Sequence, residues 1–503
     1  MDYSKSVGLN PKYNTFDLSH DKKLTMKMGE IIPVMAMDVL PGDKFTIESS
    51  HLTRFLPLVA PVMHQVKVKV RYFFSPNRLV WSNWEDFITG PESATDVSEP
   101  THPTVTATGV PSTLADYMGI NTATHDVYTG VEVNALPFAH YQFIYNEYFR
   151  DQNLVDELDY KLTDGNNTPG DLLSKRKVAW QHDRFTSSLP FTQKGPEVTL
   201  PVVGGDIGLT QLRDLSGNVL AGDFNLRSAD PPPTIGGQLV TLQSGTNVPT
   251  QLVLREEDFN PATINQLREA FAIQKWLELN ARSGNRYTEH IQAHFGVTPQ
   301  DARLQRPEEF GGSVSTVQFS EVLQTADTAD GDLGTMGGHG ITASGSRKSS
   351  YYAQEHGWIF AVMYVVPDSS YFQGIPKKFD KIDRYDYYQP LLAHIGEQPV
   401  KLRELFANGT QSDNTTFGYL PIYDEYRHET SSVHGLMKTD LKHWHMSRDF
   451  GTSVPALNET FVSCNPTDRI FTETEDAEQI IAHVYNKVNV GRKVAYYGTP
   501  MGI

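Results

Sequence analysis

The chain is poor in cysteine and in long apolar runs. Its single cysteine, Cys464, excludes an internal disulfide framework and multi-thiolate metal sites, and is typical of a buried apolar position. The longest apolar run, Trp358 to Val366, has nine residues, whereas a helix needs about 20 to span a bilayer. The N-terminal residues contain no apolar segment typical of a secretory signal. These absences predict a soluble protein made in a cytoplasm, without membrane insertion.

Positive charge is also scarce. Lys and Arg number 43 against 60 Asp and Glu, which gives a formal net charge of −17 over 503 residues. A protein that binds nucleic acid over much of its surface is normally basic, because it must neutralise phosphates. The composition argues against such a protein but leaves room for a local basic face.

Signatures of common enzyme classes are missing. No segment matches a phosphate-binding P-loop, a G-x-S-x-G nucleophile elbow or an H-E-x-x-H metal site. His290 and His294 are spaced as on one helical face, and His443, His445 and Asp449 approximate the first metal motif of cupins, which are jelly rolls. Neither group shows a complete ligand set, so structural roles are preferred for both. A cupin-like metal-dependent enzyme is the alternative.

Strand patterns dominate the chain. Apolar and polar residues alternate from Val66 to Tyr72 and again over Gln479 to Val490, which predicts strands with one buried face. Trp358 to Val366 has no polar face and is predicted to be a central strand buried on both sides. The turn Pro41 to Asp43 separates two further strand patterns, IIPVMAMDVL and KFTIES.

Two helices are predicted. One begins at the N-cap Asn260, has a proline at its first position and continues to Arg282. Its apolar stripe consists of Ile264, Leu267, Ala270, Phe271 and Leu277. The other is a short aromatic helix over residues 139–150.

Two segments rich in glycine or proline are poor in the aromatic residues that a core requires. The segment from Pro196 to Arg255 contains one aromatic residue, Phe224, and the segment 311–350 contains eight glycines and Phe319. We expect the first to be a surface insertion and the second an exposed glycine-rich loop. Many strand patterns and few helices predict a mainly β sandwich, with 1–503 forming a single domain with insertions.

Basic residues gather in two clusters. The first consists of Lys175, Arg176 and Lys177. The second consists of Lys377, Lys378, Lys381 and Arg384, interleaved with Phe379, Tyr385, Tyr387 and Tyr388. Cations beside aromatic rings are typical of surfaces on which single-stranded nucleic acid stacks, so both clusters are DNA-facing candidates. The alternative is a solvated rim or an ion-paired contact between subunits.

Longer sequence blocks resemble one family. The N-terminal blocks are KLTMKMGEIIPVMAMDVLPGDKF, RFLPLVAPVMH and RYFFSPNRLVWSNWEDFITG. They are followed by ALPFAHYQFIYNEYFRDQNL, DRFTSSLPFTQKG and the long block from TINQLREAFAIQKWLELNAR to LQRPEEFGG. RYDYYQPLLAHIGEQPV, FGYLPIYDEYRH and LKHWHMSRDF complete the series. In this order they resemble the major capsid protein of microviruses (Microviridae), closest to the gokushovirus-like branch of these single-stranded-DNA bacteriophages.

The resemblance implies a structural protein and not an enzyme. It implies an eight-stranded viral jelly roll with long inserted loops, assembled with its own copies into a T=1 icosahedral shell around circular single-stranded DNA. The expected further partners are a small basic DNA-binding virion peptide, a DNA pilot (minor capsid) protein and a host cell-surface receptor. The insertion from Pro196 to Arg255 is expected to form a protrusion at the threefold axes and to contact the host.

The resemblance also implies a place in the virion, and in the host bacterial cytoplasm during assembly. No cofactor is expected, although the acidic turn from Asp327 to Asp332 would allow a structural calcium ion.

Overall fold

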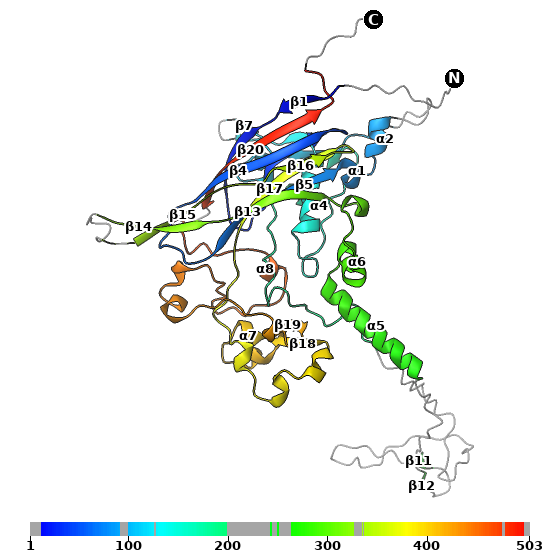
Figure 1. The fold of residues 1–503 in the computed structure, drawn as a ribbon, viewed down its shortest axis with the longest axis vertical. Helices are drawn as coiled ribbons and strands as arrows, with labels where there is room; N and C mark the ends of the chain where they lie inside the picture. The colour runs from blue at the N-terminus through cyan, green and yellow to red at the C-terminus, as the bar shows by residue number, and fades with distance from the viewer. Residues whose placement is uncertain are drawn as a thin grey trace. The chain divides into compact units, whose positions relative to one another are not determined.

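The computed structural model describes residues 12–90, 99–124, 127–198, 242–243, 249–250, 263–325, 334, 336–474 and 478–496. The chain forms two compact units. The larger consists of Met1–Thr192 and Ser283–Ile503, and the smaller of Gln193–Arg282. The larger unit is built around two antiparallel sheets that pack face to face (Figure 1).

Eight of the described strands form the sandwich. They are β2 (His20–Met26), β3 (Ile32–Val39), β4 (Lys44–Phe55), β5 (Val66–Pro76), β13 (Glu308–Thr316), β15 (Met336–Gly345), β17 (Gly357–Pro367) and β20 (Ile480–Arg492). One sheet has the order β2-β20-β4-β15 and the other β3-β17-β5-β13. Successive strands pass from one sheet to the other, except β5 and β13, which are neighbours. This topology is that of a jelly roll and confirms the predicted fold.

Three more strands extend the larger sheet to seven. They are β1 (Asn14–Asp17), β14 (Gln318–Leu323) and β16 (Ser349–Tyr352). β1 pairs with β20, β14 with β15, and β16 with β4. Of these three, β14 adds a strand beyond β15, whereas β1 and β16 continue the rows of β2 and β15 along β20 and β4.

The strand patterns in the sequence correspond to buried faces in the structure. In β5 the side chains of Val66, Val68, Val70 and Tyr72 are all buried in the core between the sheets. β20 alternates between buried and exposed residues over most of its length. The strands on either side of the predicted turn, β3 and β4, are confirmed but enter different sheets, because the turn crosses the edge of the sandwich.

β17 is a central strand buried on both sides, as predicted. Alternate residues such as Ile359 and Met363 point into the core between the sheets. The residues between them, such as Phe360 and Val362, belong to a second core with α4 (Leu136–Tyr148), which lies beyond β5 and β17 (Figure 1). Because each fully buried apolar side chain contributes about 1.5–3 kcal/mol, this strand is the most heavily stabilised part of the smaller sheet.

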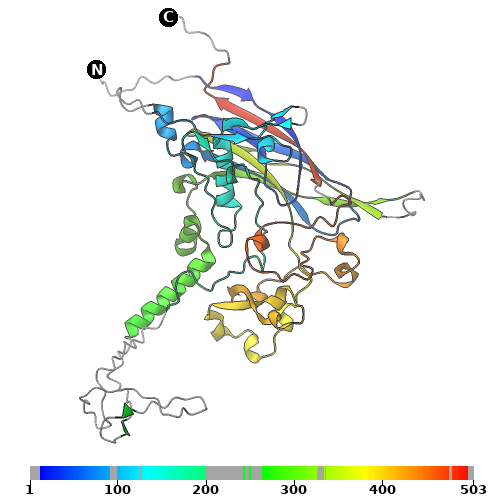
Figure 2. The same cartoon turned by 180° about the vertical axis from the view of Figure 1, so that it is seen from behind.

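Long insertions carry the other elements. Between β5 and β13 lie α1 (Asn77–Val80), α2 (Trp84–Thr89), β6 (Thr104–Ala107), α3 (Leu114–Tyr117), β7 (Ala123–Thr124), β8 (Val127–Tyr128), β9 (Val131–Asn134), α4, β10 (Asn166–Asn167), β11 (Leu242–Gln243), β12 (Pro249–Thr250), α5 (Ile264–Ser283) and α6 (Tyr287–Phe295). Between β17 and β20 lie β18 (Glu397–Lys401), α7 (Leu402–Leu405), β19 (Thr416–Pro421) and α8 (Glu459–Val462). The second insertion, seen from behind in Figure 2, has its own apolar core, to which Phe185 of the first insertion contributes.

Both predicted helices are confirmed, with two qualifications. α4 begins at Leu136, before the predicted start, and is buried nearly all round. α5 is described from Ile264, so the predicted N-cap lies outside the described residues. In its apolar stripe Ala270 is buried, but Ile264 and Phe271 are 70% and 63% exposed.

The expectation of an exposed loop over 311–350 is corrected by the structure. Most of its described residues belong to β13, β14, β15 and β16. A Cβ atom at Gly338 would lie 2.6 Å from the carbonyl oxygen of Ala60, because Leu58 and Gly338 exchange backbone hydrogen bonds. At Gly340 it would lie 2.8 Å from the Phe319 ring. The glycines therefore allow close packing within a sheet, and do not mark a loop.

The predicted insertion, from Pro196 to Arg255, differs in its bounds from the compact unit that contains it. That unit begins at Gln193 and ends at Arg282, so it also includes most of α5, which the prediction left outside the insertion. Pro196 is among the described residues, whereas Arg255 is not. Apart from 196–198 and the paired strands β11 and β12, the predicted insertion lies outside the described residues, as does the acidic turn at 327–332.

Candidate functional site

The cupin-like histidine motif does not form a metal site. His443 lies in a short 3₁₀ turn, η10 (Lys442–Trp444), whereas a cupin holds its histidine pair on a strand. His445 is buried, and its Nε2 donates to the carbonyl oxygen of Met437 (2.8 Å) while its Nδ1 accepts from the amide of Ser447 (3.1 Å). Both ring nitrogens of His445 are thus used by the backbone. This geometry overturns the cupin alternative.

The other histidine pair shows no metal site, and the cysteine is not an activated nucleophile. His290 and His294 lie on one face of α6, with ring centroids 4.2 Å apart. In the described part of the chain, no three His, Cys, Asp or Glu side chains are grouped as a metal site requires. Cys464 is fully buried, and burial raises the pKa of its thiol to about 12, so it is not a nucleophile at neutral pH.

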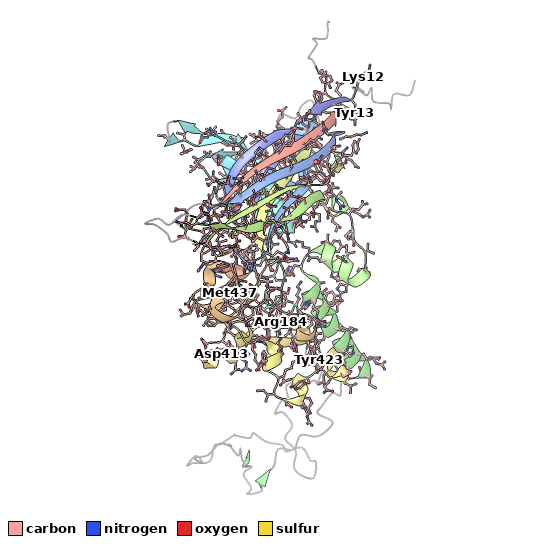
Figure 3. The ribbon with its side chains drawn as sticks, turned by 60° about the vertical axis from the view of Figure 1, so that its left-hand side comes forward. Lys12, Tyr13, Arg184, Asp413, Tyr423 and Met437 are labelled. Atoms are coloured by element: carbon pink, nitrogen blue, oxygen red, sulfur yellow. The ribbon has the colours of Figure 1, made fainter. Side chains whose placement is uncertain are left out.

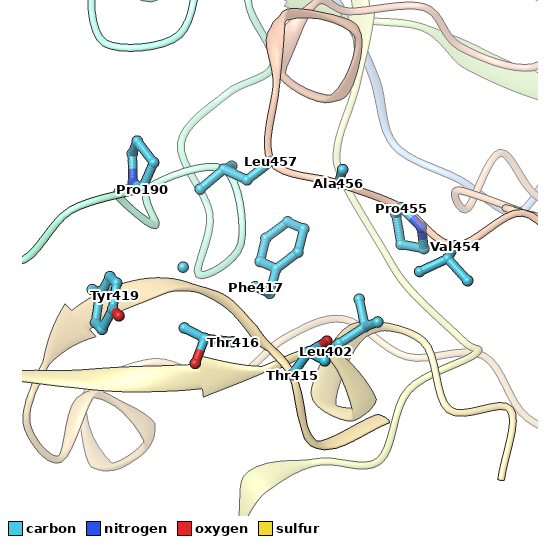
Figure 4. A pocket seen from close by; sticks show the side chains of 11 residues that line it. Pro190, Leu402, Thr415, Thr416, Phe417, Tyr419, Val454, Pro455, Ala456 and Leu457 are labelled. Atoms are coloured by element: carbon cyan, nitrogen blue, oxygen red, sulfur yellow. The ribbon is translucent and has the colours of Figure 1, made fainter. Parts of the chain in front are cut away.

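The apolar core of the second insertion opens into a pocket of about 440 Å³ (Figure 4). It is lined by Pro190, Leu402, Thr415, Thr416, Phe417, Gly418, Tyr419, Val454, Pro455, Ala456 and Leu457. No charged residue, histidine or cysteine is among them. The pocket therefore lacks a general acid, a general base and an activated nucleophile.

A larger groove, of about 910 Å³, runs beside it. Its two arginines have structural partners. The guanidinium of Arg448 lies 4.0 Å from the centroid of the Phe461 ring, and Arg469 donates to the carbonyl oxygens of Lys442 and Ser447 (both 2.8 Å). These contacts occupy both guanidinium groups, and the residues that line the groove form no catalytic constellation.

The second basic cluster lies on a surface of exposed apolar and aromatic side chains, which we call the apolar loop face. It is carried by three 3₁₀ turns, η4 (Lys377–Phe379), η5 (Arg384–Asp386) and η6 (Pro390–His394). Its exposed large side chains are Ile375, Phe379, Ile382, Tyr385, Tyr387, Tyr388, Leu391 and Ile395. Ile382 and Leu391 are 88% and 92% exposed, which is unusual for large apolar side chains.

The lysines of this face are paired with carboxylates. Lys378 lies 2.8 Å from Glu429, and Lys381 lies 3.0 Å from Glu425 in an almost fully buried pair. Burial alone would lower the pKa of Lys381, but contacts with Tyr426 and Glu425 outweigh it and raise that pKa. The carboxylates therefore neutralise positive charge that would otherwise attract phosphates.

A buried ionic network is centred on Arg184, which Figure 3 labels. Arg184 contacts Glu404 at 2.7 Å and Asp424 at 3.4 Å, and all three side chains are buried. Lys377 reaches the same Glu404 at 3.7 Å. Removal of one partner would leave a buried charge uncompensated, at a cost of about 3–5 kcal/mol, and Lys377 links η4 to this network.

The first basic cluster is paired as well. Lys175 lies 3.0 Å from Glu30, Arg176 lies 3.1 Å from Asp171, and Lys177 donates to Asn465 at 2.7 Å. In the second cluster Arg384 stacks on Tyr385, with its guanidinium 4.8 Å from the ring centroid. The sequence prediction did not include these partners; Glu30 is distant along the chain, whereas Asp171 lies five residues before Arg176.

Comparison with known proteins identifies the family. A family model described as "Capsid protein (F protein)" matches residues 9–502. The chain belongs to this capsid protein family. It is 31% identical to Capsid protein VP1 of Chlamydia phage 1, covering 97% of this chain and 95% of the relative. It is 32% identical to Capsid protein VP1 of Bdellovibrio phage phiMH2K (96% and 94%) and 31% identical to that of Spiroplasma virus 4 (92% and 89%).

Membership in the capsid protein family confirms the resemblance found in the sequence. A member of this family is a structural component of a virion and not an enzyme. Among the described helices, none combines the length and the apolar character that crossing a bilayer requires.

Proposed function

We propose that this capsid protein is the subunit of a T=1 icosahedral shell that encloses circular single-stranded DNA. The observation that carries the proposal is the apolar loop face. A soluble protein rarely leaves side chains such as Ile382 and Leu391 almost fully exposed unless a partner covers them. A closed shell provides that cover, because heterologous contacts between identical subunits can close into rings.

The fixed geometry of this face supports the same function. An icosahedral contact must recur with the same shape at every subunit. The buried Arg184–Glu404 pair and the Lys381–Glu425 pair hold the turns in one conformation before assembly. A preorganised surface loses less conformational entropy when it becomes an interface. The ion pairs thus favour a subunit contact for the second basic cluster.

A charge introduced on the apolar loop face tests the proposal. The substitution Leu391→Glu places a carboxylate where a neighbouring subunit would cover the residue. We expect the variant subunit to fold, since Leu391 is exposed, but to give no particles in electron micrographs. Leu391→Met is the matched control and should assemble. Normal particles from Leu391→Glu would show that this face is not a subunit contact.

The insertion from Pro196 to Arg255 is proposed to contact the host. Its scarcity of aromatic residues supports a surface position, because such a segment has little with which to build a core. Replacement of Pro201 to Gln251 by a Gly/Ser linker should permit shell assembly and abolish or redirect adsorption to host cells. Failure to form particles would identify the segment as an assembly arm, and unchanged adsorption would contradict the receptor role. The small basic virion peptide and the DNA pilot protein remain proposed partners of the shell interior.

A further inference from the structure

The two sheets of the sandwich differ in what covers them. The outer face of the smaller sheet is covered over β17 by α4 and the insertion around it, whereas at the edge strand β13 Val314 is 63% exposed. The outer face of the larger sheet stays open in the described part of the chain: Ile481, Tyr485 and Leu52 are 48%, 43% and 38% exposed. Since the described chain covers much of one outer sheet face and leaves the other open, the open face is available to a partner.

Two lysines and two tyrosines meet at one end of this open face, and we call them the lysine–tyrosine cluster. Lys44 begins β4, Lys493 directly follows β20, Tyr352 ends β16 and Tyr13 precedes β1. The pairing register brings them together, because Lys44 is opposite both Tyr352 and Gly491. Figure 3 labels Tyr13 at this end of the sheet.

The cluster combines exposed rings with adjacent cations. The Nζ atom of Lys44 lies 5.3 Å from the ring centroid of Tyr13 and 5.9 Å from that of Tyr352, and the Nζ of Lys493 lies 5.5 Å from Tyr13. Tyr13 and Tyr352 are 43% and 51% exposed. Tyr496, 60% exposed, packs nearby on Phe16.

Two lysines of the cluster have no carboxylate partner in the part of the chain that the structure describes. Within the described residues, neither Lys44 nor Lys493 has a carboxylate within 4.0 Å, whereas Lys378 and Lys381 on the apolar loop face are both ion-paired. A neighbouring acid, Asp43, is buried and paired with Arg492 at 2.6 Å. In a chain with a net charge of −17, two adjacent lysines without carboxylates are a local site for an anion.

The rest of the open face is mixed in charge. Arg54 and Lys487 point outward from β4 and β20, and Lys487 lies opposite Glu48 in the register. Lys23 is paired with Asp21. The lysine–tyrosine cluster is therefore the part of the face best suited to a polyanion with flat rings.

We propose that the lysine–tyrosine cluster binds single-stranded nucleic acid, with Lys44 and Lys493 at phosphates and Tyr13 and Tyr352 stacked on bases. This inference rests on the proposed function, in which the shell encloses single-stranded DNA. It places the interior of the shell at the open face of the larger sheet and the covered sheet on the opposite side. Flat rings beside cations bind single strands without sequence preference, as packaging of a whole genome requires.

The test is binding of a fluorescent oligothymidylate to the full-length subunit, measured by anisotropy over a range of salt concentrations. In the double variant Lys44→Gln with Lys493→Gln, loss of two phosphate contacts should reduce the slope of log Kd against log salt by about 1.4, at about 0.7 per contact. Tyr352→Leu should weaken binding about 5- to 150-fold and leave that slope unchanged, because it removes stacking and no charge. Thermal midpoints verify that each variant is folded.

The matched control is the double variant Lys161→Gln with Lys438→Gln, which removes the same charge from exposed positions outside the cluster. It should retain the wild-type slope. If both cluster variants bind the oligonucleotide with the same Kd and the same salt dependence as the control, the proposal is wrong. Normal oligonucleotide binding with loss of particles would also overturn it, and would assign the cluster to an acidic surface of a second copy. Particle formation by the unmodified protein is scored separately and tests the proposed function alone.

Discussion

His140 lies fully buried in the core around α4, between two polar side chains. Its Nε2 donates to Asn77 Oδ1 (3.0 Å), and its Nδ1 accepts from the Ser75 hydroxyl (2.8 Å). Burial lowers the pKa of the imidazole from 6.5 to about 3. Between these two values the unfolded chain binds a proton that the folded chain does not. Stability should therefore fall as the pH decreases through this window, by up to about 1.4 kcal/mol per pH unit.

The substitution His140→Gln tests this linkage. The variant should be less stable at neutral pH, because the hydrogen bonds are altered, but its melting temperature should fall less steeply between pH 6.5 and roughly pH 4. His394→Gln, at an exposed histidine, is the control and should follow the wild-type slope. If the melting temperatures of His140→Gln and the wild type change equally with pH in thermal scans, His140 is not the source of the pH dependence.

Cys464 offers a second measurement at the scale of one residue. Its thiol is buried, and burial raises its pKa to about 12, so neither access nor ionisation favours alkylation. We expect iodoacetamide to leave the folded subunit unmodified and to label it once in denaturant, as mass spectrometry would show. Rapid labelling of the folded subunit would mean that the core around α4 opens readily.

At the scale of the element, two adjacent glycines in β15 should respond differently to substitution. A Cβ at Gly338 would meet the backbone of Ala60 at 2.6 Å, whereas at Gly337 the nearest atom is 3.7 Å away. Gly338→Ala should destabilise the subunit by about 1–3 kcal/mol, since backbone must move. Gly337→Ala should change stability by less than about 0.5 kcal/mol. Equal denaturation midpoints for the two variants would contradict the close approach.

The sequence predicts an element well when the cause of burial is local. β5 and β20 alternate because one face meets the core, and β17 is apolar throughout because both faces do. The local pattern does not predict β15, because the glycines of this strand pack against the distant segment around Leu58. The ion pairs of the candidate site cannot be predicted from the sequence for the same reason. Lys381 and Glu425 meet only through the folding of the second insertion.

At the scale of the whole molecule, hydrogen exchange distinguishes the buried strands of the sandwich from the surfaces proposed to contact other subunits. β14 is an edge strand with most side chains exposed, and the apolar loop face consists of short turns. Both should exchange quickly in isolated subunits and slowly in particles, because neighbouring subunits cover them. β17 should be protected in both states. Equal exchange of β14 and the loop face in the two states would argue against burial of these elements on assembly.

The place of β20 in the larger sheet also sets the timing of folding. Among the described strands, β1 and β2 pair only with β20, which ends at Arg492. At about 5–20 residues per second, the ribosome releases Arg492 on the order of 20 to 90 s after Met26. During synthesis the first strands have no pairing partner, and the open sheet face does not yet exist. Each subunit therefore completes its jelly roll only after β20 is made, so translation itself delays assembly until that strand has emerged.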